Sequence, residues 1–522
     1  MSTGSAMSAS DVHQTNGDVA VNADDQLSLT ARTVRGAGWV VGWRVATRLL
    51  GTISTLFLVR LLAPGDFGLV ALASAFSNGL DGLSEIGVGN ALIREHRIDR
   101  ALYDTGFTLN AIRGVTSAVL IVCCAWPVAR FFAEPRLAGV LLALAAGLSI
   151  SAAENIGIVD FQRNLAFERE FGLYLAPRIL GIAACLSVAY VYRSYWALVV
   201  GILTTRSLRL LCSYLMHPYR PRLSLRAWRQ IVGFSFWSWM LAWVSMIRDR
   251  IDNFTIGRML GTTQVGLYSI ACDVGLLGAN ELVAPITRAL FPGLVQVRIH
   301  GKDVADAYFR AISATLVLVM PVGAGVALVA SPLIQLVAGP RWGAAVPLIQ
   351  IFAVVGAFRV VTYISTTLMT VYGMLQVQFA STAGILLVRF TLLLVLIGRF
   401  GLVGAGYAVA IVAILEEAFY LVVTFRRFHL RPAKLFAGNW RSAIATAAMV
   451  AVVVPMQTMF EWGPAATIGH LAVQVLGGAV TYMVVLFFAW VLSGRPWGPE
   501  AQIIAVARDA ARLLQRRGLA AR

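Results

Sequence analysis

The run RLLAPGDFGLVALAS at residues 60–74 returns 198 positions later as RMLGTTQVGLYSIAC at residues 258–272. Each run connects an apolar stretch that carries charged residues to a second apolar stretch. Five of the fifteen aligned positions are identical, which apolar sequences can reach by chance, so the shared context adds weight to the match. We therefore predict that the chain is an internal duplication. The identical pairs are Arg60 and Arg258, Leu62 and Leu260, Gly68 and Gly266, Leu69 and Leu267, and Ala73 and Ala271.

The composition around these runs is typical of a membrane protein. Of the 522 residues, 58% are hydrophobic and only 13% are charged. Soluble domains have about 25% charged residues, so this chain has too few to cover a water-facing surface. This excludes an ordinary soluble enzyme, a secreted disulfide-linked domain and a disordered chain. The net charge of +17 is spread between apolar stretches instead of gathered in one patch, which argues against a nucleic-acid partner.

Apolar stretches of about 20 residues, each long enough to cross a hydrocarbon core, recur from residue 36 onward. We predict an all-α, polytopic membrane protein with about fourteen transmembrane helices. Because six stretches separate the two repeated runs, the repeat is parallel, and a pseudo-two-fold axis along the membrane normal relates two six-helix lobes. Two further helices follow at the C-terminal end. The predicted spans are 38–62, 66–92, 106–127, 137–158, 172–192, 195–216, 233–257, 265–290, 310–330, 343–371, 377–398, 402–425, 441–460 and 467–492.

These spans divide the chain into five parts. We expect a disordered cytoplasmic tail over residues 1–35, an N-lobe over 36–216, a C-lobe over 217–430, helices 13 and 14 over 431–493, and a basic tail over 494–522. The basic tail has the amphipathic pattern of a helix that lies on anionic membrane lipids, and a solvated tail fits it equally well. Loops after the even-numbered spans hold sixteen Lys and Arg against six in the opposite loops. The positive-inside rule therefore predicts that both termini are cytoplasmic.

Charged residues inside the apolar spans are the strongest functional signal. A charge at the bilayer centre costs about 2.5–3.5 kcal/mol, so it normally faces a partner or a water-filled cavity. Arg44 and Arg48 stand four residues apart in the first span and share one helical face. We interpret them as a site for an anionic group such as a diphosphate, because a guanidinium matches phosphate oxygens with its fork of donors. The alternatives are structural ion pairs between the first two spans, or arginines that reach the membrane interface.

Other charged residues within the spans of both halves are also candidates for the lining of the water-filled cavity. Asp81 and Glu85, again four residues apart, lie in the second span and would balance the arginines or bind a coupling cation. Arg113, Arg248 and Asp252 complete the set of candidate cavity or coupling charges. Arg248 and Asp252 are close to the outer end of the seventh span, so an interfacial position is the alternative for them.

Several kinds of site have no signature here. The sequence contains no Walker motif, no HExxH and no clustered His or Cys, and its five cysteines form no CxxC pair. We therefore expect no enzyme activity, cofactor or metal. Transport against a gradient would then draw on an ion gradient or on the membrane potential, which is worth about 2.3 kcal/mol per charge per 100 mV.

Several stretches resemble the polysaccharide transporter family, the Wzx-type oligosaccharide flippases of the multidrug/oligosaccharidyl-lipid/polysaccharide exporter superfamily. The run VDFQRNLAFEREF (159–171) is similar to that family's loop between helices 4 and 5, and the resemblance covers roughly residues 35–430. The other matching stretches are LVRLLAPGDFGLVALA (58–73), EIGVGNALIRE (85–95), RIDNFTIGRMLGTTQVGLYSIA (250–271) and RWGAAVPLIQIFAV (341–354).

The resemblance implies two lobes that rock to open a cationic central cavity in a bacterial inner membrane. The implied cargo is an undecaprenyl-diphosphate-linked oligosaccharide that moves to the outer leaflet for exopolysaccharide or O-antigen assembly. Implied partners are a polysaccharide polymerase and a chain-length regulator. Related peptidoglycan-precursor flippases use first-lobe arginines for the diphosphate, and Arg44 and Arg48 occupy comparable positions on the first helix. The acidic cation site of sodium-driven drug exporters has no clear match here.

Three other functions stay open. A drug/cation antiporter of the same superfamily would have twelve helices and an acidic cavity. A membrane glycosyltransferase or polysaccharide polymerase would need a sizeable outer loop for its catalytic residues, and we find no outer loop much longer than the one around Arg341. A scaffold without transport activity is also compatible with the sequence.

Overall fold

The computed structural model describes residues 42, 46–83, 88–89, 92, 99–163, 166–228, 236–301, 303–459 and 467–494. The predicted tail 1–35, the predicted tail 494–522 except Gly494, and the candidates Arg44 and Glu85 lie outside these residues. Within them the prediction of an all-α chain is confirmed, because helices account for all the regular structure and no strand occurs.

The helices of the first half follow one another with short connections. After a helix over residues 46–61 they are α2 (Pro64–Leu83), α4 (Arg100–Phe131), α5 (Arg136–Ala152), the 3₁₀ turn η1 (Ile156–Ile158), α6 (Val159–Arg163), α7 (Phe167–Tyr192) and α8 (Trp196–Met216). The second half contains α10 (Phe236–Leu260), α11 (Thr262–Gly275), α12 (Leu277–Ile299), α13 (Val304–Val337), η2 (Pro340–Ala345), α14 (Val346–Phe358), α15 (Val360–Val371), α16 (Leu375–Arg427), α17 (Pro432–Met459) and α18 (Thr467–Leu492).

Each of the fourteen predicted spans overlaps helical residues. In the described part of the chain, eight helices are long and apolar enough to cross a membrane, or nine if α5 and the bent segment after it form one span. Two predicted spans fall within α16, which is divided by a non-helical backbone at Gly401 (φ 59°, ψ −139°). Positive φ favours glycine because it has no Cβ. The number of fourteen crossings stays a prediction.

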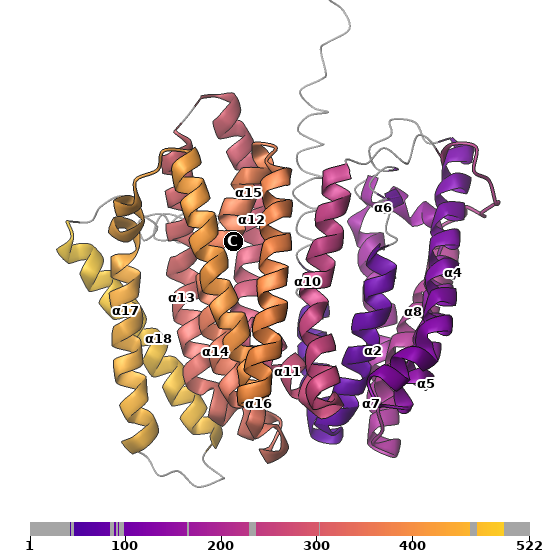
Figure 1. Ribbon diagram of the computed structural model, residues 1–522, viewed down its shortest axis with the longest axis horizontal. Helices are drawn as coiled ribbons and strands as arrows, with labels where there is room; N and C mark the ends of the chain where they lie inside the picture. The colour runs from indigo at the N-terminus through magenta and orange to yellow at the C-terminus, as the bar shows by residue number, and fades with distance from the viewer. Residues whose placement is uncertain are drawn as a thin grey trace, which may run out of the picture.

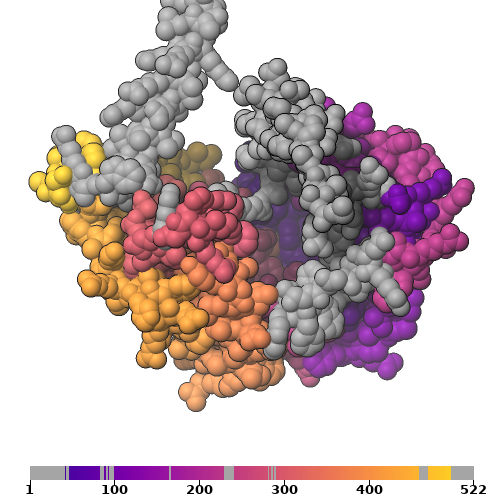
Figure 2. Space-filling model, turned by 90° about the horizontal axis from the view of Figure 1, so that it is seen from above, coloured from indigo at the N-terminus to yellow at the C-terminus, as the bar shows by residue number. Residues whose placement is uncertain are grey.

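The helices form two groups that meet along one boundary. Figure 1 shows α2 and α4–α8 in one group, α12–α18 in the other, and α10 and α11 between them. In the second group α17 and α18 pack against each other and against α13, and the Tyr482 hydroxyl donates to the Val317 carbonyl at 2.7 Å. Seen from above, the molecule is hollowed between the two groups, and N-terminal atoms are visible at depth (Figure 2).

The two halves are in closest contact where the repeated runs meet. A Cβ on Gly68 would lie 1.7 Å from the Thr262 carbonyl oxygen, and a Cβ on Gly266 would lie 1.9 Å from the Pro64 carbonyl oxygen. Pro64 and Thr262 are themselves matched positions of the repeat. Each glycine of one run therefore packs on the first turn of the other run's helix, as a local two-fold axis requires. We call this crossing of α2 and α11 the closed end.

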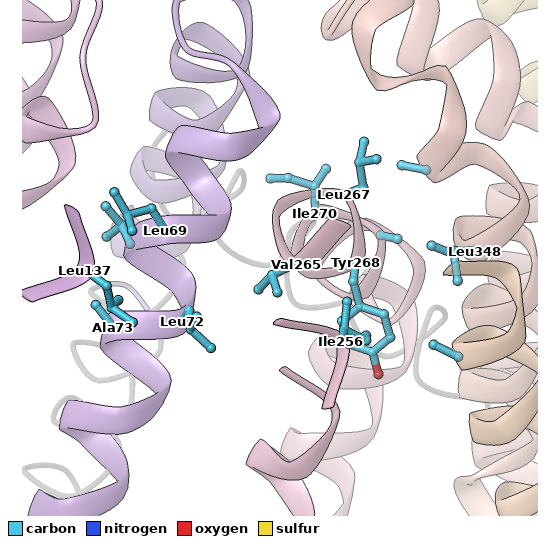
Figure 3. Packing of buried hydrophobic residues seen from close by; sticks show 14 of the residues in the cluster. Leu69, Leu72, Ala73, Leu137, Ile256, Val265, Leu267, Tyr268, Ile270 and Leu348 are labelled. Carbon is cyan, nitrogen blue, oxygen red and sulfur yellow. The ribbon is translucent and has the colours of Figure 1, made fainter. Parts of the chain in front are cut away.

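Buried apolar side chains surround this crossing. Leu69 and Leu72 on α2 and Val265 and Ile270 on α11 belong to one continuous core (Figure 3). This core also contains Trp342, whose indole nitrogen donates to the Val59 carbonyl oxygen at 3.0 Å. Apolar burial contributes about 25 cal/mol for each Å² removed from water, so the closed end is held by packing as well as by backbone proximity.

Two arginines at matched positions reinforce the closed end from opposite sides. The Arg60 guanidinium donates to the carbonyl oxygens of Val337, at 2.8 Å, and Leu336, where α13 ends. The Arg258 guanidinium lies over the Phe131 ring at 5.4 Å, where α4 ends. A cation near a helix C-terminus interacts favourably with the helix dipole. Each half thus contacts a helix end of the other.

Candidate functional site

Arg48 connects the first helix to the second half of the molecule. Its Nε lies 2.8 Å from Glu281 Oε1 on α12, and the two side chains are 46% and 45% exposed. Asp273 on α11 is close enough to interact electrostatically with the same guanidinium. The pair is therefore half-exposed and spans the two halves. The alternative of an ion pair between the first two spans does not describe Arg48, whose partner Glu281 is on α12.

A second charged group lies inside the first half. Arg113 Nη1 on α4 is 3.4 Å from Asp81 Oδ1 on α2, and the side chains are 18% and 31% exposed. Arg206 on α8 interacts electrostatically with Asp81, and its buried Nη1 makes no hydrogen bond. Nearby, Arg209 holds Glu154 through two hydrogen bonds of 2.7 Å. Three arginines against two carboxylates leave this interior cationic.

A third group is buried in the second half, where α10, α11 and α16 meet. Asp252 is 4% exposed and accepts hydrogen bonds from Arg389, with Nε at 2.8 Å, and from the Tyr268 hydroxyl. Arg248 Nη1 is 3.3 Å from Glu416. Arg248 and Asp252 are therefore paired inside the second half, and their depth relative to the membrane interface stays a prediction.

This group extends to a break in the predicted tenth span. The helix stops at Phe358 and restarts at Val360, and Arg359 at the junction lies 4.0 Å from Glu416. The backbone N–H of Thr362 donates to the Glu417 carboxylate at 3.1 and 3.3 Å. A carboxylate at a helix N-terminus satisfies free N–H groups and favours the helix dipole.

One titratable group outside the spans belongs to the closed end. Glu134, between α4 and α5, accepts hydrogen bonds from Arg136 at 2.8 and 2.9 Å, and the Thr262 hydroxyl of the other half is 3.5 Å from it. The bond from Arg136 lowers the pKa of the Glu134 carboxyl, which stays ionised at neutral pH. Glu134 therefore adds a polar contact to the crossing.

The sequence predicted which charges are buried but not how they pair. Glu281, Arg389 and Glu416 were evident only as charges inside apolar stretches, because their partners are more than a hundred residues away. Among the residues that the structure describes, no group of three or more His, Cys, Asp or Glu could hold a metal ion.

Comparison with known proteins identifies the family of the chain. The family described as "Polysaccharide biosynthesis protein" matches residues 57–347, more than half of the sequence. The chain belongs to this family. Among its relatives, the lipopolysaccharide biosynthesis protein WzxC of Escherichia coli (strain K12) is 24% identical over 341 residues, which cover 64% of this chain and 68% of that protein. The probable flippase AglR of Haloferax volcanii is 23% identical over 475 residues, which cover 87% of this chain and 96% of that protein.

The solved structures confirm the fold class of this family member. The lipid II flippase MurJ in an inward closed conformation superposes with a TM-score of 0.70 at 13% identity, over 87% of this chain and 98% of that one. The resemblance to Wzx-type polysaccharide transporters is thus confirmed by family, relatives and fold.

Proposed function

We propose that the protein is a flippase, not an enzyme, that moves undecaprenyl-diphosphate-linked oligosaccharides across the bacterial inner membrane for exopolysaccharide or O-antigen assembly. The named functions of WzxC, AglR and MurJ support this proposal. The observation that carries it is the half-exposed Arg48–Glu281 pair, which joins the two halves of a flippase-like fold.

Arg44 and Arg48 bind the diphosphate in this proposal. Without cargo, Glu281 neutralises Arg48 at 2.8 Å. A diphosphate carries more negative charge and more acceptor oxygens than one carboxylate, so it displaces Glu281 and engages both arginines. Arg44 precedes Arg48 by four residues in the predicted first span, and a helix over that span would present both side chains on one face.

Transport then follows by alternating access. The present arrangement is sealed at the closed end by Gly68, Gly266 and the two crossed arginines, and it is hollowed at the opposite face (Figure 2). With the orientation predicted from the loop charges, the hollow faces the cytoplasm, where lipid-linked precursors are made. Cargo binding that replaces the Arg48–Glu281 bridge removes one link between the halves and permits the closed end to part.

The other charged groups have different parts in this proposal. Asp252 is fully engaged by Arg389 and Tyr268, so it serves as an anchor of the second half. Asp81, 31% exposed and close to Arg113 and Arg206, is better placed as the coupling site. The remaining predictions from the sequence are also part of this proposal. They are lobe boundaries at residues 216 and 430, cytoplasmic termini, a basic tail that binds anionic lipids, and a polysaccharide polymerase and a chain-length regulator as partners.

Polymer export in cells tests this function. The double variant R44A/R48A should lose export while it stays in the membrane at the normal level. The matched control R310A/R427A removes two exposed arginines elsewhere and should export normally. Full export by R44A/R48A, or equal loss in the control, would defeat the diphosphate role. In a strain without the protein, accumulation of the lipid-linked oligosaccharide distinguishes a flippase from the drug/cation antiporter.

A further inference from the structure

The segment after α8 is fixed along α4 by its backbone. We call this segment, residues 217–228, the strap. Three of its backbone N–H groups donate hydrogen bonds to side chains on one face of α4. The bonds run from Arg222 to Asp104 (3.1 Å), from Ser224 to Thr108 (2.8 Å) and from Ala227 to Thr105 (3.2 Å). These three bonds are made by main-chain groups of the strap, so they hold its backbone against α4.

One end of the strap forms an open pocket of about 480 Å³ lined by Arg100, Tyr103, Pro218, Tyr219 and Arg220. The two tyrosine rings pack against each other with centroids 5.2 Å apart and planes inclined by 37°. Their hydroxyls donate to Asp160 and Asp104, so these carboxylates are engaged within the pocket wall. The rings thus form a rigid floor.

The two arginines provide the charge of this pocket. The Arg220 Nη1 donates to the carbonyl oxygens of His217 and Tyr219, both at 3.0 Å, which holds the guanidinium in place and leaves its other donors available. The Arg100 side chain is 60% exposed, and its Nε is 3.9 Å from Asp104, beyond hydrogen-bond distance. A phosphate matches such a pair, because each guanidinium offers several donors to its oxygens.

The remainder of the strap is amphipathic. Leu223, Leu225 and Trp228 are 78%, 46% and 47% exposed, and the exposed Arg222 and Arg226 alternate with them. Apolar and aromatic side chains interleaved with arginines are typical of segments that lie in the membrane interface. The strap therefore presents a pocket with two arginines beside exposed apolar side chains suited to acyl chains.

We propose that the pocket and strap bind an anionic phospholipid, with the phosphate between Arg100 and Arg220 and the acyl chains against Leu223 and Leu225. The position of the strap favours bulk phospholipid over cargo. It is bonded to α4, which packs against α5, α2 and η1 on the outer side of the first half, away from the boundary between the halves (Figure 1). The proposal is independent of what the protein transports.

Native mass spectrometry of the purified full-length protein tests the site, with phosphatidylglycerol, phosphatidylcholine or undecaprenyl diphosphate added singly at equal concentration. The wild type should retain phosphatidylglycerol in preference to phosphatidylcholine. R100A/R220A should bind phosphatidylglycerol about 30-fold more weakly, from about 1 kcal/mol per basic residue at an anionic surface. Both side chains are exposed, so the variant should fold, and its thermal unfolding should match the wild type.

The control R310A removes an exposed arginine that pairs with Asp306 in the other half, and it should retain phosphatidylglycerol normally. The proposal is overturned if R100A/R220A binds phosphatidylglycerol as the wild type does, or if phosphatidylcholine is retained equally. It is also overturned if R100A/R220A loses undecaprenyl diphosphate and not phosphatidylglycerol, because the site would then belong to the cargo.

Discussion

Replacing Gly68 with alanine should open the closed end. The new Cβ would lie 1.7 Å from the Thr262 carbonyl oxygen and 2.6 Å from the Gly266 backbone nitrogen. Both are main-chain atoms, so no side chain can rotate away. Ordinary contact begins at 3.4 Å, and α2 and α11 must therefore separate by about 1.7 Å. Overpacking of this kind costs about 1–3 kcal/mol, and 2 kcal/mol corresponds to about a 30-fold shift away from the closed arrangement.

Disulfide formation across the crossing measures this shift. A Cβ on Gly65 would lie 3.2 Å from the Thr263 hydroxyl oxygen, so the pair G65C/T263C is within disulfide distance while the end is closed. In a background without the five native cysteines, G68A should slow cross-linking at least tenfold. G266A should do the same, because it occupies the matched position of the repeat.

The control for this experiment is G325A, since a Cβ at Gly325 would meet nothing within 4 Å. It should cross-link at the parent rate. Each variant is first compared with the parent by membrane level and thermal unfolding, which separates opening of the closed end from loss of folding. Cross-linking of G68A at the parent rate in a folded protein would refute the role of the glycine contact.

Three further predictions follow from individual contacts. R389A leaves Asp252 buried without its cation and should destabilise the protein by about 3–5 kcal/mol, measured as thermal unfolding in detergent. The double variant R389A/D252N should recover part of this stability. An R389A protein as stable as the wild type would contradict the pairing. Reporter fusions at Leu225 and Gly401 should indicate cytoplasm and outside respectively, and the reverse pattern would overturn the orientation. The hydrogen bond from Arg136 lowers the pKa of Glu134, so the ionised carboxylate stabilises the fold above its ordinary pKa, and this stabilisation is lost as pH falls through the lowered value. E134Q should therefore show a smaller decrease in melting temperature at acidic pH. An identical decrease in E134Q and the wild type would exclude Glu134 as its source.

The sequence predicted the elements of the fold better than their contacts. The repeat anticipated the equivalence of Gly68 and Gly266, and hydropathy located the long apolar helices, because both signals are local. The direct contact of these glycines could not be predicted, since it depends on how α2 and α11 cross. The break at Arg359 was also missed, because residues 343–371 are apolar on both sides of it.

In the candidate site, too, the sequence indicated the residues and did not indicate their partners. The position of Arg48 in an apolar stretch predicted that it needs a partner or water, because a lone membrane charge is costly. That its partner is Glu281, 233 residues away, depends on the packing of the two halves and has no signature in the sequence. The pairing of Asp252 with Arg389 was likewise hidden, although both charges were evident.

The most direct measurement of the central claim is translocation by the purified protein in liposomes. A fluorescent undecaprenyl-diphosphate oligosaccharide starts in one leaflet, and a membrane-impermeant quencher reports its arrival in the other. The wild type should move this lipid, and R44A/R48A should not, even though its G65C/T263C cross-link still forms. Equal translocation by the two proteins would show that these arginines do not receive the diphosphate.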